Sequence, residues 1–192
     1  MARNGTRAMS IVELMVVVVI IGILAGISVV SYRHYIARAR LSEPTAMLAE
    51  LSAKEQLYYL ATGLYIEAHR DTQASTSTNE NPSEFYPTDA STYFDSARTP
   101  VALGTLPASW QILGIRPRWR ALYCTYLVNA GPAGATLPGV IGPTLWTASP
   151  NVPWFYALGA CNLSGPSGWP NNVTVLALTN DSPAIQTTDE KE

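Results

Sequence analysis

The chain has 192 residues, of which 14 are acidic and 12 are lysine or arginine, so its formal net charge at pH 7 is −2. This length allows one ordinary domain plus an additional element, and the charge balance excludes the basic field typical of nucleic-acid-binding proteins. Charged residues make up only 14% of the chain. The deficit of charge falls in an apolar N-terminal run and in a second half rich in proline and glycine.

An apolar segment of membrane-spanning length lies close to the N-terminus. Residues 1–8 are polar and basic, and from Leu14 to Val30 there is no charged residue. A helix over this run would be about 26 Å long, just enough to cross a bilayer. Three interpretations are open: a secretory signal peptide cut after Ser28, a plain membrane anchor, or a buried core helix. The helical pattern continues to Leu41 without a turn signal, which argues against the cut after Ser28.

None of these interpretations explains Glu13, an acidic residue inside the apolar run. A charged side chain at the middle of a membrane segment costs about 2.5–3.5 kcal/mol on insertion scales, and less near an end. Such a residue is therefore expected to be functional and to have a partner. The surrounding sequence, "AMSIVELMVVVVIIGILAGI" (residues 8–27), resembles the N-terminal signal of type IV pilins and type II secretion pseudopilins. The resemblance extends to about residue 65.

The resemblance implies a specific maturation. A prepilin peptidase would cut on the cytoplasmic side between Ala8 and Met9, Met9 would be N-methylated, and Glu13 would stand fifth in the mature chain. In filaments of this family the equivalent acid faces the N-terminal amine of a neighbouring subunit, which would make Glu13 an assembly residue that fixes register. Two residues depart from the family pattern. Ala8 stands where the family has glycine, and Val30 stands where it often has a helix-kinking proline, so a straighter helix is expected.

The positive charges around the apolar run favour the opposite orientation. Two arginines precede it, whereas Arg33, Arg38 and Arg40 follow it, and the positive-inside rule would then leave the C-terminal part in the cytoplasm. Against this count, the cysteines favour an oxidising compartment, and the resemblance requires a cytoplasmic leader. We therefore expect a precursor in the bacterial inner membrane with its head outside the cytoplasm, and afterwards an extracellular filament.

After a transmembrane and polymerisation helix at residues 9–31, an amphipathic helix is expected to continue over residues 32–65 into the head. Glu43 is expected on its polar face. Pro44 should bend the helix or melt a turn, and Gly63 should end it. The main apolar stripe consists of Leu41, Met47, Leu48, Leu51, Tyr58, Tyr59 and Tyr65.

A second apolar face on this helix consists of Leu57, Leu60 and Leu64. A helix that is apolar on two faces needs two packing partners, which are expected to be its own head and neighbouring subunits. Residues 66–109 follow, with polar and turn-forming residues and no clear period. They are predicted to form a long irregular surface loop.

Residues 110–180 are expected to form an antiparallel β-sheet that buries the C-terminal half of the helix. Three segments bounded by Gly, Pro or Asn clusters are typical of strands, namely "RWRALYCTYLVN", "PWFYALGACNL" and "VTVLALTN". Cys124 and Cys161 lie on two of them, and an even cysteine count in an exported protein predicts a disulfide. Closing a loop of about 37 residues would stabilise the head by about 4 kcal/mol. The acidic tail, residues 181–192, is expected to be frayed.

No residues with catalytic, cofactor-binding or metal-ligating spacing stand out. The two histidines, His34 and His69, have no ligand partner at helical or hairpin spacing and are expected to be solvated. The sequons at Asn162 and Asn172 are formal glycosylation motifs without further support. Neither an enzyme nor a cofactor is expected.

The sequence therefore indicates an α+β, pilin-like fold, in which one long N-terminal helix packs on an antiparallel sheet. The function implied by the resemblance is that of a major or minor type IV pilin, a structural subunit of a filament for motility, adhesion or related roles. Its expected partners are other pilin subunits, the prepilin peptidase, the inner-membrane assembly platform and membrane lipid before assembly. The alternatives are a type II secretion pseudopilin and a membrane-anchored secreted binding protein that does not polymerise.

Overall fold

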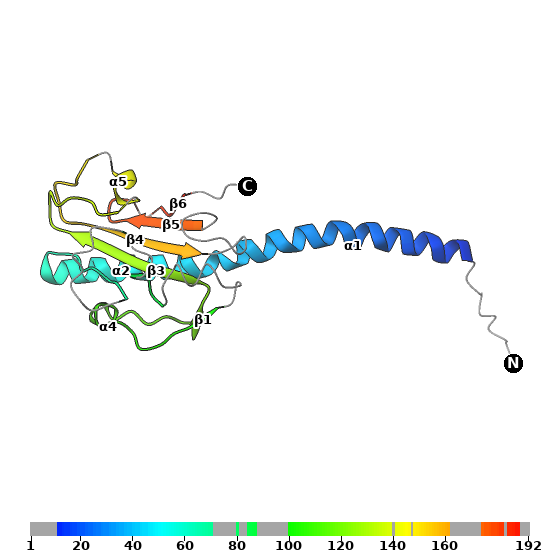
Figure 1. Ribbon diagram of the computed structural model, residues 1–192, viewed down its shortest axis with the longest axis horizontal. Helices are drawn as coiled ribbons and strands as arrows, with labels where there is room; N and C mark the ends of the chain where they lie inside the picture. Colours follow the sequence, from blue (N-terminus) through cyan, green and yellow to red (C-terminus); the bar gives the residue numbers. More distant parts are fainter. Residues whose placement is uncertain are drawn as a thin grey trace. The chain divides into compact units, whose positions relative to one another are not determined.

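The structure is a computed structural model, and it describes residues 11–70, 80, 84–87, 100–139, 141–146, 148–161, 174–182 and 184–188. The chain divides into two compact units, Met1–Ala39 and Arg40–Glu192. The first holds nearly all of one apolar helix. The second is a head in which a helix packs on an antiparallel sheet (Figure 1), so the predicted α+β class is confirmed.

The helical part of the chain is interrupted once. Helix α1 (Ile11–Arg40) is followed by α2 (Ser42–Thr62), and Leu41 between them adopts φ −67° and ψ −16°. Pro44 accounts for the interruption, because it has no N–H to donate to the carbonyl of Arg40 and its ring crowds that carbonyl. The single helix expected over residues 32–65 is therefore divided. Gly63 ends α2 as predicted, with a left-handed φ of 77° and its N–H donated to Tyr59 O at 2.7 Å.

The main sheet is an antiparallel meander in which each strand pairs with the next along the chain. Alternate residues of its strands enter two different clusters of buried side chains, as with Phe155 on one face and Trp154 on the other. Both faces are thus covered, which explains why the strands are apolar throughout rather than alternating. The four strands are β3 (Cys124–Gly131), β4 (Trp154–Cys161), β5 (Thr174–Thr179) and β6 (Gln186–Thr188).

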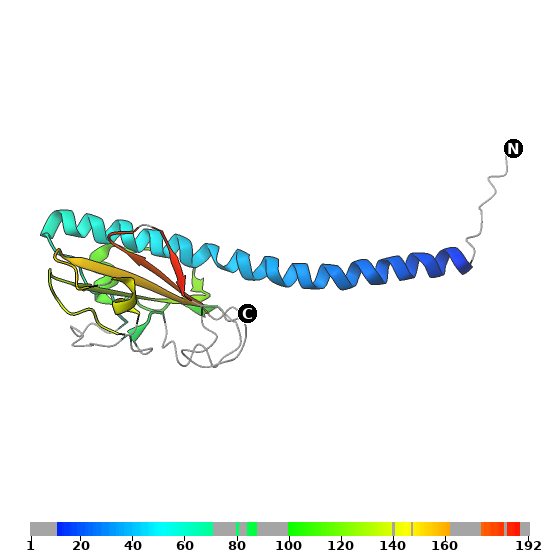
Figure 2. The same cartoon turned by 90° about the horizontal axis from the view of Figure 1, so that it is seen from above.

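Helix α2 lies along one face of this sheet (Figure 2). Met47, Leu48 and Leu51 are fully buried there, as the predicted stripe requires. The expectation that Glu43 lies on the polar face is wrong, because Glu43 is only 6% exposed. Its Oε1 accepts the N–H groups of Tyr123 at 2.9 Å and Cys124 at 3.2 Å and the hydroxyl of Tyr126 at 3.0 Å, which offsets the cost of burying a carboxylate.

The outer edge of β3 is paired with two residues from the segment that was predicted to be an irregular surface loop. Ala68 and Val128 exchange backbone hydrogen bonds of 3.0 and 3.1 Å, and Tyr86 and Tyr126 exchange bonds of 2.9 and 2.7 Å. Ala68, Phe85 and Tyr86 are buried. The described part of residues 66–109 is therefore not merely surface, since it satisfies a sheet edge that would otherwise be open.

Two boundaries of the predicted sheet region also need correction. Residues Ala108–Leu113 form a short helix, α4, and Trp110 is fully buried on it rather than starting a strand. The predicted frayed tail includes β6, whose threonines suit a strand and which extends the sheet by pairing with β5. The remaining elements are a small ribbon of β1 (Val101–Ala102) with β2 (Ala121–Leu122), and the turn helix α5 (Gly142–Leu145).

Candidate functional site

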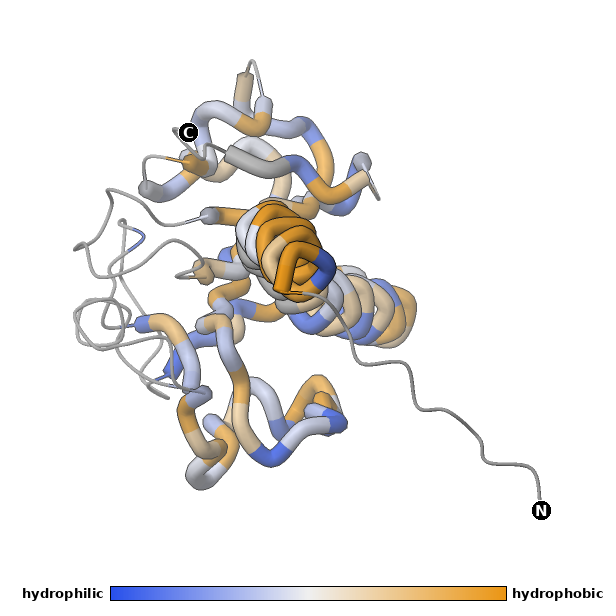
Figure 3. Tube along the Cα trace, turned by 90° about the vertical axis from the view of Figure 1, so that its right-hand side faces the viewer, coloured by the Kyte–Doolittle hydropathy of each residue, from blue (hydrophilic) through white to orange (hydrophobic). Residues whose placement is uncertain are grey.

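The candidate site for assembly is the first part of α1. Ile11–Ser28 is the one described helical stretch that is long and apolar enough to cross a membrane, and every residue in it is exposed. Eighteen residues rise about 27 Å, close to the hydrocarbon thickness of a bilayer. In Figure 3 the N-terminal part of α1 is coloured mostly as hydrophobic along the trace, so the stretch Ile11–Ser28 has no face suited to water.

The polar groups in this stretch stand near its two ends. The hydroxyl of Ser28 donates to the carbonyl of Leu24 at 2.7 Å, so its hydrogen-bonding capacity is used within the helix. Glu13 lies in the first turn of α1 and is the only ionisable residue between Ile11 and Ser28. The N–H groups at a helix N-terminus favour a negative charge at this position.

The predicted maturation residues lie just before this helix. Ala8 and Met9 fall outside the described residues, as do the sequons at Asn162 and Asn172, and the side chain of His34 is likewise not described.

The two cysteines form the predicted disulfide at one end of the sheet. Cys124 and Cys161 stand opposite each other at the start of β3 and the end of β4, with their Cα atoms 4.4 Å apart. This spacing is typical of the closer of the two kinds of antiparallel pair, in which side chains approach each other. The bridge links the first long strand of the head to the second.

His69 is not the solvated residue that was predicted. It is 4% exposed, its Nε2 donates to Oδ1 of Asn129 at 2.9 Å, and its Nδ1 lies 3.5 Å from Oε2 of Glu84. Asn129 in turn donates to the hydroxyl of Tyr156 at 2.7 Å, and that hydroxyl donates to Glu80 at 3.0 Å. Within the described residues, no three His, Cys, Asp or Glu side chains are grouped so as to hold a metal ion. These hydrogen bonds connect the buried side chains of His69, Asn129, Tyr156 and Glu80 inside the head.

Glu80 is a second buried carboxylate that the sequence did not single out. It accepts the N–H of Ile141 and that of Gly142, both at 2.8 Å, and thereby fixes the start of α5. Burial, followed by the nearby charge of Glu80, raises the pKa of the Tyr156 hydroxyl well above its ordinary value, so Tyr156 stays protonated and keeps donating. No local signal could have identified Glu80, since its partners are about 60 residues away.

Known proteins resemble this chain at its N-terminus and over short stretches. Residues 3–29 match the prokaryotic N-terminal methylation motif. Forty residues are 50% identical to a fimbrial protein of Moraxella nonliquefaciens. Sixty-one residues are 34% identical to the type IV major pilin protein PilE1 of Neisseria gonorrhoeae, and 65 residues are 32% identical to the fimbrial protein EcpC of Eikenella corrodens.

These matches cover only part of each protein. They span 21%, 32% and 34% of this chain, and 26%, 28% and 42% of the three relatives in the same order. No solved structure matches the chain at comparable significance. The chain therefore carries the N-terminal methylation motif found in prepilins and is similar, over part of its length, to type IV pilins and fimbrial proteins.

Proposed function

We propose that the chain is a structural subunit of a type IV pilus, held in the inner membrane as a precursor and then assembled into an extracellular filament. The observation that carries this proposal is the exposed apolar stretch Ile11–Ser28 with one acidic residue in its first turn, inside the methylation motif. An apolar surface of this length needs lipid or other protein around it. Lipid would cover it before assembly, and the helices of other subunits would cover it in the filament.

The second apolar face of α2 supports contacts between subunits. Leu57 and Leu60 on α2 are 61% and 80% exposed, and Leu64, just beyond the end of α2, is 51% exposed, whereas the opposite face of the helix is buried on the sheet. In a filament these leucines would be available to pack against a neighbouring copy. An exposed apolar face is expected in a subunit that packs against other copies, but not in an anchored protein that does not polymerise.

Maturation would place a new positive charge close to Glu13. A cut between Ala8 and Met9 removes Arg3 and Arg7 and leaves a methylated amine four residues before Glu13. Opposite charges a few ångströms apart attract strongly in an apolar environment, and such a pair serves register more than stability. Within one subunit the amine is about 6 Å along the helix from Glu13, so a pair inside the subunit is the alternative to a pair between subunits.

The variant Glu13→Val separates these two arrangements. If the pair joins subunits, the variant should insert normally and accumulate in the membrane, but its amount in sheared filaments should fall by about tenfold or more, because breaking a buried ion pair costs about 3–5 kcal/mol. The measurement is the ratio of subunit in sheared filaments to subunit in membranes. Glu13→Asp should give an intermediate ratio, since its shorter side chain weakens the contact.

A matched control is Ser28→Val, which also replaces a polar residue of the apolar stretch by valine but lies at its other end. Its ratio of filament to membrane subunit should equal that of the wild type. A wild-type ratio for Glu13→Val would reject the role of Glu13 in assembly. A loss of Glu13→Val from the membrane itself would instead favour the pair within one subunit.

A further inference from the structure

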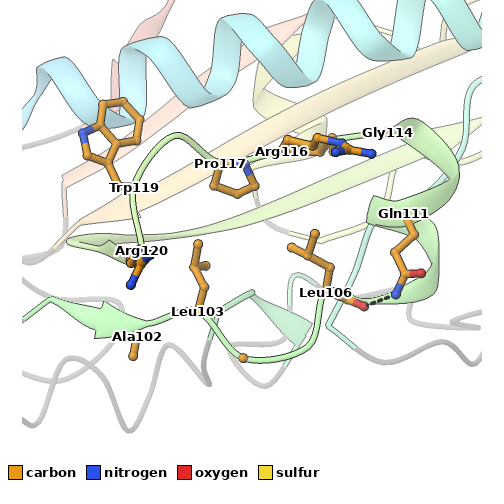
Figure 4. A pocket seen from close by; sticks show the side chains of 11 residues that line it. Ala102, Leu103, Leu106, Gln111, Gly114, Arg116, Pro117, Trp119 and Arg120 are labelled. Atoms are coloured by element: carbon orange, nitrogen blue, oxygen red, sulfur yellow. Dashed lines mark hydrogen bonds between the residues drawn. The ribbon is translucent and has the colours of Figure 1, made fainter.

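The head carries an open depression of about 960 Å³ bounded by the β1–β2 ribbon, α4 and the loop 114–120. This volume lies at the upper end of the range of ligand pockets. Its floor is aliphatic, and Figure 4 shows the side chains of Leu103, Leu106 and Pro117 between its two ends. Trp119 and Arg120 stand at one end, and Arg116 and Gln111 at the other. The site therefore combines an apolar floor with a guanidinium group at each end.

Within the described residues, the side chains of Arg116, Arg120 and Trp119 form no ion pair, hydrogen bond or ring contact. Arg116 and Arg120 are exposed, and neither forms an ion pair with any carboxylate in the described part of the chain. Trp119 is 38% exposed and makes no ring contact with another described aromatic residue. The loop itself is held in place, because the backbone N–H of Arg116 donates to Oε1 of Glu50 on α2 at 3.1 Å. The guanidinium groups of Arg116 and Arg120 and the indole of Trp119 are therefore available to a ligand, on a loop that this hydrogen bond attaches to α2.

The charge of the rest of the head narrows the choice of ligand. Of the chain's 14 acidic residues only Glu13 precedes residue 41, whereas five of its 12 basic residues do, which leaves 13 acidic against seven basic residues after that point. Three of those seven are Arg116, Arg118 and Arg120. Nucleic acids are bound through many phosphate contacts, and an acidic head with two lining arginines does not offer them. The two lining arginines suit instead an anion of which only two charged groups need a partner.

A peptide is also a poor fit. An added peptide strand needs a free sheet edge of some length, but β1 and β2 have only two residues each. Gln111 is already engaged, since its Nε2 donates to Leu106 O at 2.7 Å, so few hydrogen-bonding groups remain for a peptide backbone. The ligand should have apolar faces for the floor and the indole, and at least two carboxylates for the two arginines.

We propose that this depression binds an acidic polysaccharide of the uronic-acid type. The C–H faces of its sugar rings would lie on Trp119 and on the aliphatic floor, and two of its carboxylates would reach Arg116 and Arg120, whose planar guanidinium groups match carboxylate geometry. This ligand site goes beyond the proposed role in a filament and does not depend on assembly.

The test uses the full-length mature protein in detergent and tetragalacturonate as the probe, with binding measured by calorimetry. Arg116→Ala, Arg120→Ala and Trp119→Ala should each weaken binding by about tenfold, equivalent to about 1.4 kcal/mol. Arg118→Ala is the matched control, because Arg118 is exposed on the same loop but does not line the depression. It should change the affinity by less than about twofold, as expected for a screened charge at a distance.

Several results would overturn the proposal. An equal loss of affinity in Arg118→Ala would show that the oligosaccharide is attracted to the basic loop in general. An unchanged affinity in Trp119→Ala would show that the sugar rings do not contact Trp119. If neutral maltotetraose bound with the same affinity as tetragalacturonate, the carboxylates would have no role in binding. Tighter binding of tetraglutamate or of a short single-stranded oligonucleotide would assign the site to a peptide or a nucleic acid.

If an alanine variant fails to fold, Arg116→Lys and Arg120→Lys replace it. Each keeps the charge but loses the planar fork, so each should still weaken binding of tetragalacturonate. Wild-type affinity in both lysine variants would count against the proposal. Because binding is measured before assembly, a negative result leaves the filament proposal standing, and a failure of filament assembly leaves this site untouched.

Discussion

Glu55 illustrates how a single buried residue sets a property of the head. It is fully buried on α2, its Oε2 accepts the N–H of Ile66 at 3.1 Å, and its Oε1 has no hydrogen-bond partner among the described residues. Burial raises the pKa of this carboxyl to about 8, although the hydrogen bond from Ile66 acts in the opposite direction. Near neutral pH the folded head therefore holds a proton that the unfolded chain has lost.

The sign of the resulting pH dependence follows from linkage. Because the pKa of Glu55 is raised from 4.5 to about 8, folding takes up a proton between these values, and the free energy of unfolding falls as pH rises through this window. Glu55→Gln should make this fall clearly shallower. It should not abolish the fall, since burial also raises the pKa values of Glu43 and Glu67.

The measurement is denaturant unfolding of the full-length protein at several pH values between 5 and 9, followed by near-ultraviolet circular dichroism. All tryptophans lie after residue 109, so the tryptophan part of this signal, at its long-wavelength end, reports the head. Gln56→Ala, at the exposed neighbour of Glu55, should reproduce the wild-type curve. An unaltered slope in Glu55→Gln would contradict this account of its buried carboxyl.

The burial of Glu43 could not have been predicted from the sequence. The helical period places Glu43 opposite the apolar stripe, yet its hydrogen-bond donors come from Tyr123 and Cys124, about 80 residues away. His69 was misjudged for the same reason, since its partner Asn129 is 60 residues distant. Partners brought together only by the tertiary fold decide whether a polar side chain can be buried.

At the scale of elements, the disulfide ties β3 to β4 at one end of the sheet. Replacing both cysteines by alanine should lower the free energy of unfolding of the head by about 4 kcal/mol, because the loop of 37 residues is no longer closed in the unfolded chain. The far-ultraviolet signal of α1 should persist, since α1 lies in the other compact unit. Unfolding by urea under non-reducing conditions measures the change, and a loss below about 1 kcal/mol would contradict the expectation.

Some elements could be predicted closely and others could not. Strands β4 and β5 lie within two residues of the predicted segments, because apolar β-forming runs bounded by Gly, Pro and Asn are a local signal. Helix α4, strand β6 and the edge pairings of Ala68 and Tyr86 were missed. Each is short, and each is stabilised by packing on residues distant in sequence, which outweighs local propensity.

At the scale of the whole molecule, the two compact units differ in how much apolar surface they expose to water. The unit Met1–Ala39 exposes an apolar helix, whereas the described part of the unit Arg40–Glu192 has a buried apolar core on each face of its sheet. The first could be predicted from sequence because it depends on a contiguous motif. The depression beside Trp119 could not, because residues 102–120, which line it, enclose it only when the β1–β2 ribbon, α4 and the loop between them have folded.

The N-terminal peptide of protein recovered from sheared surface filaments tests the central claim most directly. If the chain is processed and assembled as a pilin, mass spectrometry should find a peptide that begins at Met9 and is heavier by one methyl group on its amine, and it should be found in the filament fraction. A mature chain that begins at Val29 would show an ordinary secretory cut that removes Glu13 and the apolar stretch. That result would contradict the account.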